Sequence, residues 1–433
     1  MVKMVLSQPG INLCWGKYLN INQIKLTVNQ IGRDGYKVVR IWLCRWGIKG
    51  LWHQEYIPEQ PNSAIDLDNL SLFLQMCHKF DIKVILTIIP HAHFLTISRY
   101  EVENPQDAWL GNPFRNISKT PYQFFSDNKI RLCFKNFLGY LYKTFPTNAL
   151  PWSIELWNEV DMIANLPGWL VVDWHRQMLN LCKTLNSKVL LTTSTAVPDS
   201  LSDLFSLDSL DAISLHNYRF PYSNAIANLW YWKNSLSRFG KQLWLTEFDF
   251  NSQKAIRNAE SRTYLQTALV AAPCLGYQIG PCFWWWESTL GHKILPQLAL
   301  SKVCEWLTTH QNHYLVDLIT ANSCNQEQDT QIKFLNVLGK TQRYLVRKLF
   351  HKTISLFGNY NNVLALQSGN NFLVLVEASK INPVYLRFKK KAKFSGICYN
   401  LLEEQALTAS IFNKDHQTYW LAQCVQILII QKK

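Results

Sequence analysis

The sequence has no apolar run long enough to cross a membrane as a helix. Its first residues, MVKMVLSQPGINLCW, also lack the long apolar segment and the small-residue cleavage site of a secretory signal peptide. These absences exclude an integral membrane protein and argue against secretion. We therefore expect a protein that lies in the cytoplasm and has no membrane partner.

No two cysteines stand at the CxxC spacing of a zinc or redox site, and their number, 11, is odd. Several lie inside apolar runs, as Cys44 does in VVRIWLC. We interpret them as buried free thiols in a reducing compartment and exclude a disulfide framework. The set is Cys14, Cys44, Cys77, Cys133, Cys182, Cys274, Cys282, Cys304, Cys324, Cys398 and Cys424.

Acidic residues are few: 30 Asp and Glu stand against 44 Lys and Arg, which gives a net charge of +14. Such a balance can indicate nucleic acid or an acidic substrate as a partner. The basic residues are scattered, however, apart from Lys389, Lys390, Lys391 and Lys393, which a solvated strand end or loop explains. The sequence carries no nucleic-acid motif, and we expect no nucleic-acid partner.

Hydrophobic residues make up 48% of the chain, enough for a large core. Aromatic residues make up 13% and include 17 Trp. They favour either an aromatic-rich core or flat surfaces on which sugar rings can stack. Composition alone leaves both interpretations open.

Eight short apolar runs alternate with amphipathic segments of helical period, such as Leu67–Phe80, Asp173–Leu185 and Arg257–Ala272. Near-continuous apolar runs are typical of parallel strands covered on both faces. An open, doubly wound sheet is the rival fold, but no glycine-rich phosphate turn follows the first run. The pattern therefore predicts an α/β protein with a (β/α)8 TIM barrel. The expected strands are Ile11–Trp15, Val38–Cys44, Lys83–Pro90, Ser153–Glu159, Val189–Ser194, Asp211–His216, Gln242–Asp249 and Ile279–Trp285.

The longest insertion, His91–Asn128, follows the third expected strand. Loops after barrel strands face the active-site end, so we expect this insertion to wall the pocket. It carries the aromatic residues Trp109, Phe114, Tyr122, Phe124 and Phe125, among others.

The pattern changes near Phe357, after two segments, Leu298–Thr308 and Gln331–Ile354, that have helical character. Beyond it, turn signals such as GNYNN and LQSGNN separate short strands. We predict a catalytic barrel over residues 1–356 and a small antiparallel β module over residues 357–433. The module should form a β-sandwich that packs on the barrel and holds no catalytic residue.

Polar side chains follow the expected strands, at the end of a barrel where chemistry occurs. Glu159 follows the apolar strand SIELWN, and Glu247 follows QLWLT. Two carboxyl groups at opposed strand ends are what cleavage of a glycosidic bond requires, since one must protonate the leaving oxygen and the other must attack the anomeric carbon or activate water. A lone Glu at a strand end is more often a solvated residue or an ion-pair partner, but the convergence of several titratable groups favours an active site.

Six motifs in order on successive strands resemble the retaining (β/α)8 glycoside hydrolases. The chain is most similar to the cellulase and β-mannanase family, family five, over about Ile11 to Trp286. Each motif alone is weak, and their joint order carries the resemblance. They are Arg40 in VVRIWL, His91 in VILTIIPH, Asn158 with Glu159 in LWNEV, His216 and Tyr218 in LHNY, Glu247 in LWLTEFD, and Trp284 in CFWWW.

The resemblance implies that Glu159 is the acid/base and Glu247 the nucleophile, with their carboxyl groups about 5–5.5 Å apart. The other matched residues are expected to bind substrate or support these two. Asn158 can bind the sugar 2-hydroxyl, and Arg40 and Tyr218 can donate hydrogen bonds to Glu247. His216 is expected to orient Glu159, His91 to bind a hydroxyl and Trp284 to stack on sugar, although a structural role stays open for both histidines.

Three consecutive Trp leave open which one stacks on sugar, and we choose Trp284 because it follows Phe283. Asp161 and Asp249 each lie two residues beyond a catalytic Glu, and we expect both to be supporting or loop residues. His91 and His93 have no third ligand at a convincing spacing, so we expect no metal.

The sequence therefore predicts a retaining O-glycosyl hydrolase that cleaves β-glycosidic bonds by double displacement and needs no cofactor. Its partner would be an oligosaccharide, polysaccharide or other glycoside. Two alternatives stay open: a transglycosylase with the same residues, and a non-catalytic carbohydrate-binding protein on the same fold. The sugar, the linkage, endo or exo action and the oligomeric state are also left open.

Overall fold

A computed structural model describes the barrel region and ten short strands after it. The described residues are 8–13, 21–43, 67–95, 112–163, 165–197, 200–218, 225–249, 259–284 and 295–310, with strands between residues 314 and 432. The predicted helix Gln331–Ile354, the run Lys389–Lys393 and the predicted boundary at Phe357 lie outside these residues.

Eight parallel strands close into a barrel in chain order, with β1 paired to both β2 and β8. Every described position of β2 and β8 is buried, because helices cover the outside and side chains fill the inside. The (β/α)8 barrel predicted from the apolar runs is therefore confirmed. The strands are β1 Gln8–Asn12, β2 Val38–Trp42, β3 Lys83–Pro90, β4 Ser153–Asn158, β5 Leu190–Thr195, β6 Ala212–Tyr218, β7 Gln242–Asp249 and β8 Ile279–Phe283.

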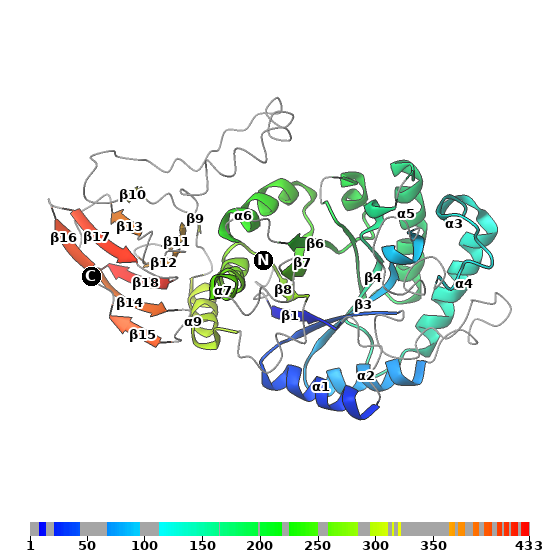
Figure 1. The fold of residues 1–433 in the computed structure, drawn as a ribbon, viewed down its shortest axis with the longest axis horizontal. Coiled ribbons are helices and arrows are strands. Elements are labelled where there is room, and N and C mark those ends of the chain that lie inside the picture. The colour runs from blue at the N-terminus through cyan, green and yellow to red at the C-terminus, as the bar shows by residue number, and fades with distance from the viewer. Residues whose placement is uncertain are drawn as a thin grey trace.

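The helices lie around this barrel in Figure 1. Helix α5 shows why they form: Leu170, Val171, Trp174 and Met178 recur at three- and four-residue spacing and are all buried. Within the described part of the chain, no helix is both long and apolar enough to cross a membrane. The helices are α1 Ile21–Arg33, α2 Leu67–Lys79, α3 Pro121–Ser126, α4 Asn128–Thr144, α5 Gly168–Leu185, α6 Ala225–Leu236, α7 Ala259–Cys274 and α9 Gln297–Thr309.

A β-bulge interrupts the pairing of β6 with β7. Leu215 pairs with Leu245, but His216 pairs with Glu247, so Thr246 is one extra residue on β7. A bulge turns the residues that follow it, and this one sets Glu247 beside His216. Strand β8 approaches β7 closely here, because Gly280 has φ +98° and an added Cβ would lie 2.3 Å from the Leu245 carbonyl oxygen. Only glycine fits at that position.

Three aromatic residues of the insertion after β3 pack under the helices, whereas Tyr122 is exposed. Phe114, Phe124 and Phe125 are buried, and Phe124 lies 5.8 Å, ring to ring, from both Trp157 and Trp174. The expectation that these three side chains wall the pocket is wrong, since they fill the space between the barrel and helices α3 to α5. Trp109 lies outside the described residues. We name this group the aromatic cluster: Phe94, Phe114, Phe124, Phe125, Phe134, Phe137, Trp157 and Trp174.

The C-terminal strands form two antiparallel sheets, ordered β10-β13-β17-β16 and β15-β14-β18-β12-β11-β9. Leu364, Leu373, Leu375 and Ile427 belong to the same core cluster as the barrel, and Figure 1 shows these strands beside α7 and α9. The two first strands precede residue 357, which favours an earlier start for the module; the division at 357 stays a prediction. The strands are β9 Tyr314–Leu315, β10 Ile319–Ala321, β11 Val363–Ser368, β12 Asn371–Val376, β13 Val384–Phe388, β14 Phe394–Asn400, β15 Gln405–Thr408, β16 Ile411–Lys414, β17 Gln417–Ala422 and β18 Gln426–Lys432.

Six cysteines in the described residues are free, and four of them are buried. Burial raises the pKa of Cys182 and of Cys282 to about 12 in each case, so both thiols stay protonated at neutral pH. For these six residues, the prediction of free thiols is confirmed. The six are Cys77, Cys133, Cys182, Cys274, Cys282 and Cys304.

Candidate active site

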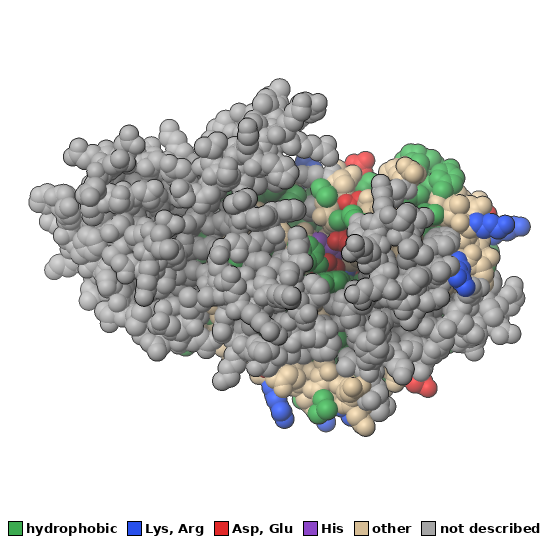
Figure 2. Space-filling view, in the orientation of Figure 1, with side chains coloured by type: hydrophobic (Ala, Val, Ile, Leu, Met, Phe, Trp, Pro, Cys, Tyr) green, Lys and Arg blue, Asp and Glu red, His purple; other side chains and the backbone are tan. Residues whose placement is uncertain are grey.

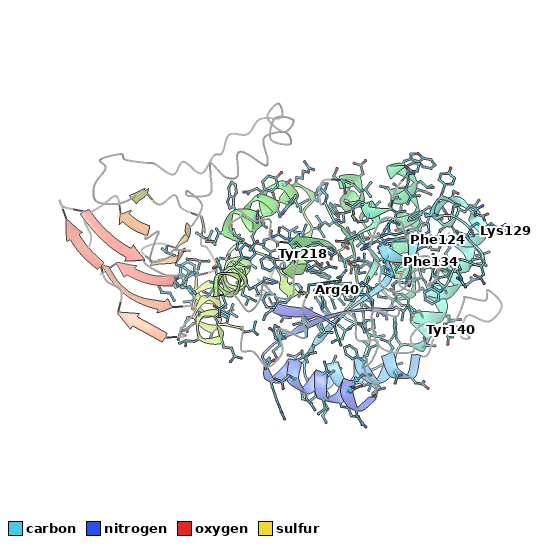
Figure 3. The ribbon with its side chains drawn as sticks, viewed as in Figure 1. Arg40, Phe124, Lys129, Phe134, Tyr140 and Tyr218 are labelled. Carbon is cyan, nitrogen blue, oxygen red and sulfur yellow. The ribbon has the colours of Figure 1, made fainter. Side chains whose placement is uncertain are left out.

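Arg40, in the middle of β2, lies at the centre of the candidate site and is fully buried (Figure 3). Its Nη1 donates to Glu247 Oε1 at 2.5 Å, and its Nη2 donates to Asn158 Oδ1 at 2.5 Å. Its Nε donates to Glu155 Oε2 at 2.6 Å. Burial opposes the charge, but the two carboxylates raise the pKa of Arg40 above its ordinary value. The guanidinium is therefore a fixed positive charge that holds Glu247, Asn158 and Glu155 in place.

The two predicted catalytic carboxyl groups meet at His216, on β6. His216 Nδ1 lies 2.8 Å from Glu159 Oε1 and 3.4 Å from Glu247 Oε2. One carboxyl oxygen of each Glu lies within 4.8 Å of the other. The side chain of Glu159 is 14% exposed and that of Glu247 only 3%, so Glu159 is the more accessible of the two. In Figure 2, acidic and histidine side chains are visible together near the middle of the face.

Glu247 accepts hydrogen bonds on both oxygens, from Arg40 and from the Tyr218 hydroxyl at 2.5 Å. Burial raises the pKa of Glu247, whereas His216, Arg40 and Tyr218 lower it. Burial likewise raises the pKa of Glu159, whose contacts are to histidines. Because a buried cation and a hydroxyl both stabilise the Glu247 carboxylate, we expect Glu247 to ionise before Glu159.

Arg40 also fixes the hydrogen bonding around Glu159. Because Asn158 Oδ1 faces Arg40, its Nδ2 faces His91 Nδ1, at 2.9 Å. His91 Nδ1 must then accept, so neutral His91 carries its proton on Nε2. Glu159 Oε2 lies 3.2 Å from the same Nδ1, which then carries no proton to donate to Glu159. Burial lowers the pKa of His91, which keeps it neutral, and burial raises the pKa of Glu159 above its ordinary value.

The backbone at Glu159 is left-handed, with φ 53° and ψ 55°. This conformation is uncommon outside glycine and is often found at functional sites. The Glu159 N–H donates to Ser194 Oγ at 3.0 Å. Two residues later, Asp161 accepts from the N–H groups of Ala196 and Val197, which ties the loop after β4 to the loop after β5. Asp161 is thus a loop-holding residue, as the sequence predicted.

Trp284 completes the group at the end of β8. Its ring lies 6.4 Å from that of Tyr218 and 5.5 Å from that of Trp42, both edge to face. Trp285 and Trp286 lie outside the described residues, so the choice among the three stays a prediction. The structure brings together all eight residues that the sequence singled out, and their catalytic and binding roles stay predictions. The eight are Arg40, His91, Asn158, Glu159, His216, Tyr218, Glu247 and Trp284.

Two buried polar residues in the site were not singled out from the sequence. Glu155, on β4, bonds to Arg40 as described above. Asn12, on β1, accepts from Arg40 Nη1 at 3.1 Å and donates to the carbonyl oxygens of Thr246 and Cys282 at 2.9 and 3.0 Å. It thereby holds the bulge before Glu247. The signal for both was a polar side chain inside an otherwise apolar strand, in SIELWN and in GINLC.

Glu159, His216 and Glu247 also meet the distance requirement for a metal site, the only such group in the described part of the chain. Their donor set does not fit a cation well. Both oxygens of Glu247 already accept hydrogen bonds, and a cation there would lie beside the buried charge of Arg40. These contacts fit a Glu247 carboxylate that is oriented to react rather than to bind a metal ion.

Neither a known family model nor a curated protein matches the sequence. Solved structures do resemble it. An endo-1,4-beta-mannanase from Rhizomucor miehei is 14% identical over 64% of this chain and 86% of its own, with a TM-score of 0.50. A family 39 glycoside hydrolase from Bacteroides cellulosilyticus is 13% identical over 98% of this chain and 81% of its own, with a TM-score of 0.57.

A third similar structure is a GH30 endoxylanase from Clostridium papyrosolvens. It is 12% identical over 100% of this chain and 97% of its own, with a TM-score of 0.52. The last two likenesses therefore extend over the C-terminal strands. All three are glycoside hydrolases, the class that the motifs predicted, and at these identities the likeness concerns the fold. The chain has the (β/α)8 fold of these glycoside hydrolases.

Proposed function

We propose that the protein is a retaining glycoside hydrolase that acts on β-linked glycosides. The observation that carries the proposal is the pair Glu159 and Glu247, on facing strand ends with carboxyl oxygens within 4.8 Å. Retaining enzymes hold their two carboxyl groups about 5–5.5 Å apart, whereas inverting enzymes need about 6.5–9.5 Å to admit a water. The short separation supports double displacement.

In the first step, protonated Glu159 gives its proton to the glycosidic oxygen while Glu247 attacks the anomeric carbon. The bond from that carbon to the leaving oxygen breaks, and an ester to Glu247 forms. In the second step, Glu159 takes a proton from water, whose oxygen attacks the same carbon and releases Glu247. Arg40 and Tyr218 receive the returning carboxylate charge through their hydrogen bonds.

Azide rescue tests the assignment of the two carboxyl groups. The substrate is an aryl β-glycoside found by a screen of β-glucoside, β-mannoside, β-xyloside and β-galactoside. Glu159→Ala should keep forming the ester from a dinitrophenyl glycoside, whose leaving group needs no protonation. Added azide should then restore turnover and give a β-glycosyl azide. Glu247→Ala lacks the nucleophile, so azide should attack directly and give the α-azide.

The anomeric configuration of each product decides the outcome. Products of the opposite configuration would mean that the roles of Glu159 and Glu247 are exchanged. Near-normal activity of either variant would remove that residue from the mechanism, since loss of a group at the reacting centre costs several orders of magnitude. Binding of sugar by the wild-type protein with no turnover of any substrate would favour the non-catalytic alternative. Transfer of the glycosyl group to an added sugar in preference to water would favour the transglycosylase.

A further inference from the structure

Glu155, on β4, is a third buried glutamate in the site, and the mechanism above gives it no part. It is fully buried, whereas Glu159, four residues later, is partly exposed. Its Oε2 accepts from Arg40 Nε at 2.6 Å and from Thr87 Oγ1 at 2.7 Å. Its Oε1 accepts from Ser214 Oγ at 3.3 Å. These three partners are side chains of other barrel strands, so Glu155 acts on neighbouring residues inside the barrel.

The contacts of Glu155 determine how Arg40 points. A guanidinium presents its donors in a fixed plane, so an acceptor on Nε sets the directions of Nη1 and Nη2. These two atoms hold Glu247 and Asn158. Asn158 in turn sets the tautomer of His91, which lies beside Glu159. The Glu155 carboxylate thus influences both Glu247 and Glu159 through its bond to Arg40.

The charge of Glu155 matters as much as its position. Burial alone would raise the pKa of Glu155, but the charge and hydrogen bond of Arg40 lower it below its ordinary value. Glu155 is therefore ionised and offsets the charge of Arg40. The titratable or charged groups that face Glu155 or Glu159 are Arg40 on β2, His91 after β3, Asp161 after β4, His216 on β6, Glu247 on β7 and Cys282 on β8.

We propose that Glu155 is a positioning residue that acts through Arg40: it orients the guanidinium and offsets its charge, and it thereby sets the protonation states of Glu247 and Glu159. The proposal rests on the proposed function for its meaning in catalysis. Without the charge of Glu155, Arg40 would stabilise both catalytic carboxylates more strongly. Both would then lose their protons at lower pH, and the pH range in which Glu247 is ionised while Glu159 is still protonated would move to lower pH.

The test is a titration of side-chain carboxyl groups by carbon NMR in wild type, Glu155→Gln and Thr87→Val. The signals of Glu159 and Glu247 are assigned by their loss in the corresponding Gln variants. In Glu155→Gln, both midpoints should fall by about one pH unit or more, the size of a nearby-charge effect. Thr87→Val removes one hydrogen bond to Glu155 and keeps its charge, so both midpoints should stay near those of wild type.

Midpoints in Glu155→Gln equal to those in wild type would overturn the proposal. The wild-type protein supplies a second check if Glu155→Gln does not fold. Its Glu155 signal, identified by the shift that Thr87→Val causes, should show an ionised carboxylate at every pH at which Glu247 and Glu159 titrate. A protonated Glu155 in that range would also overturn the proposal. Neither measurement needs turnover. The role of Glu155 can therefore be refuted while the proposed glycosidase activity stands, and the activity can be refuted while the role of Glu155 stands.

With an active substrate, the pH dependence of kcat/KM gives a further readout. Both limbs should move to lower pH in Glu155→Gln, and kcat should fall more than KM rises, because Glu155 does not touch the substrate. Glu155→Asp keeps the charge but shortens the side chain. In this variant the two limbs of the pH profile should stay at their wild-type positions, and kcat should fall about tenfold or more. A kcat equal to that of wild type in Glu155→Asp would contradict the orienting role.

Discussion

Strand β4 joins two regions of opposite character. Glu155 and Asn158 belong to the Arg40 network inside the barrel. Trp157, between them in the chain, packs in the aromatic cluster, 4.8 Å, ring to ring, from Phe125. Figure 3 shows Arg40 and Tyr218 within the barrel and Phe124 and Phe134 on the side of α3 and α4.

The two regions hold together by different physical means. Polar atoms in the Arg40 network are paired at 2.5–3.3 Å with fixed directions, so no neighbouring side chain can replace a partner that is lost. In the aromatic cluster, ring centroids lie 4.8–5.9 Å apart at varied angles. That packing depends on volume and apolar area. Substitutions should therefore affect chemistry and pH dependence in the first region, and stability alone in the second.

The largest effect is expected for Arg40→Met, which replaces the charge by an apolar chain of similar length. Activity should fall by about three orders of magnitude, because Glu247 loses a charged donor. The variant should also lose about 3–5 kcal/mol of stability at neutral pH, because Glu155 is left as a buried, unpaired carboxylate. Activity assays and denaturant unfolding measure the two effects.

The pH dependence of that loss identifies its cause. In wild type the folded-state pKa of Glu155 is lowered, so its contribution is present above its unfolded pKa and is lost as pH falls. In Arg40→Met, burial would raise the folded-state pKa instead, and stability would be lost as pH rises. The difference between the two proteins should therefore grow from acidic to neutral pH. A constant difference would contradict the assignment of charge to Glu155.

Trp174→Ala is the matching change in the aromatic cluster. Trp174 is fully buried, and its ring lies 5.1 Å from that of Phe134 and 5.5 Å from that of Trp157. Its loss should cost about 3–5 kcal/mol at every pH, with kcat/KM per folded molecule unchanged. Trp174→Phe is the control: among the described residues the indole N–H has no partner, so this change should cost about 1 kcal/mol. A shift of the pH profile in either variant would contradict the separation of the two regions.

The comparison also explains what the sequence could predict. Barrel strands are covered on both faces, so they appear as continuous apolar runs, and the polar residues at their ends appear as interruptions. Glu159 and Glu247 were visible for that reason. Strand ends were less accurate: the first strand was expected at Ile11–Trp15 and β1 is Gln8–Asn12.

Other features depend on three-dimensional arrangement that residue type does not encode. Glu155 is one charge inside a strand, and only the neighbouring strands show that it bonds to Arg40. The bulge at Thr246 arises from pairing with β6. Phe124 and Phe125 were expected at the pocket because a stacking surface and a core use the same side chains. Which one they build is decided by the helices that cover them.

A smaller effect in the Arg40 network is expected for Tyr218→Phe. The change removes the hydroxyl that donates to Glu247 Oε2 and keeps the ring beside Trp284. Loss of a hydrogen bond to a charged group costs about 1.5–3 kcal/mol, which corresponds to a loss in kcat/KM of about ten- to a hundredfold. The hydroxyl lowers the pKa of Glu247, so its removal should move the acidic limb to higher pH. An acidic limb at the wild-type position would mean that Tyr218 acts only through packing.

The smallest effect is expected at the edge of the network, for Asp161→Asn. The negative charge of Asp161 raises the pKa of Glu159, so its removal should move the alkaline limb of the pH profile to lower pH. The shift should be less than about one pH unit, since Asp161 is only partly buried. Ser200→Ala is the matched control, because the Ser200 hydroxyl donates to Asp161 Oδ2 at 2.6 Å and its loss leaves the charge in place. If both variants moved the limb equally, the loop that Asp161 holds, and not its charge, would be what tunes Glu159.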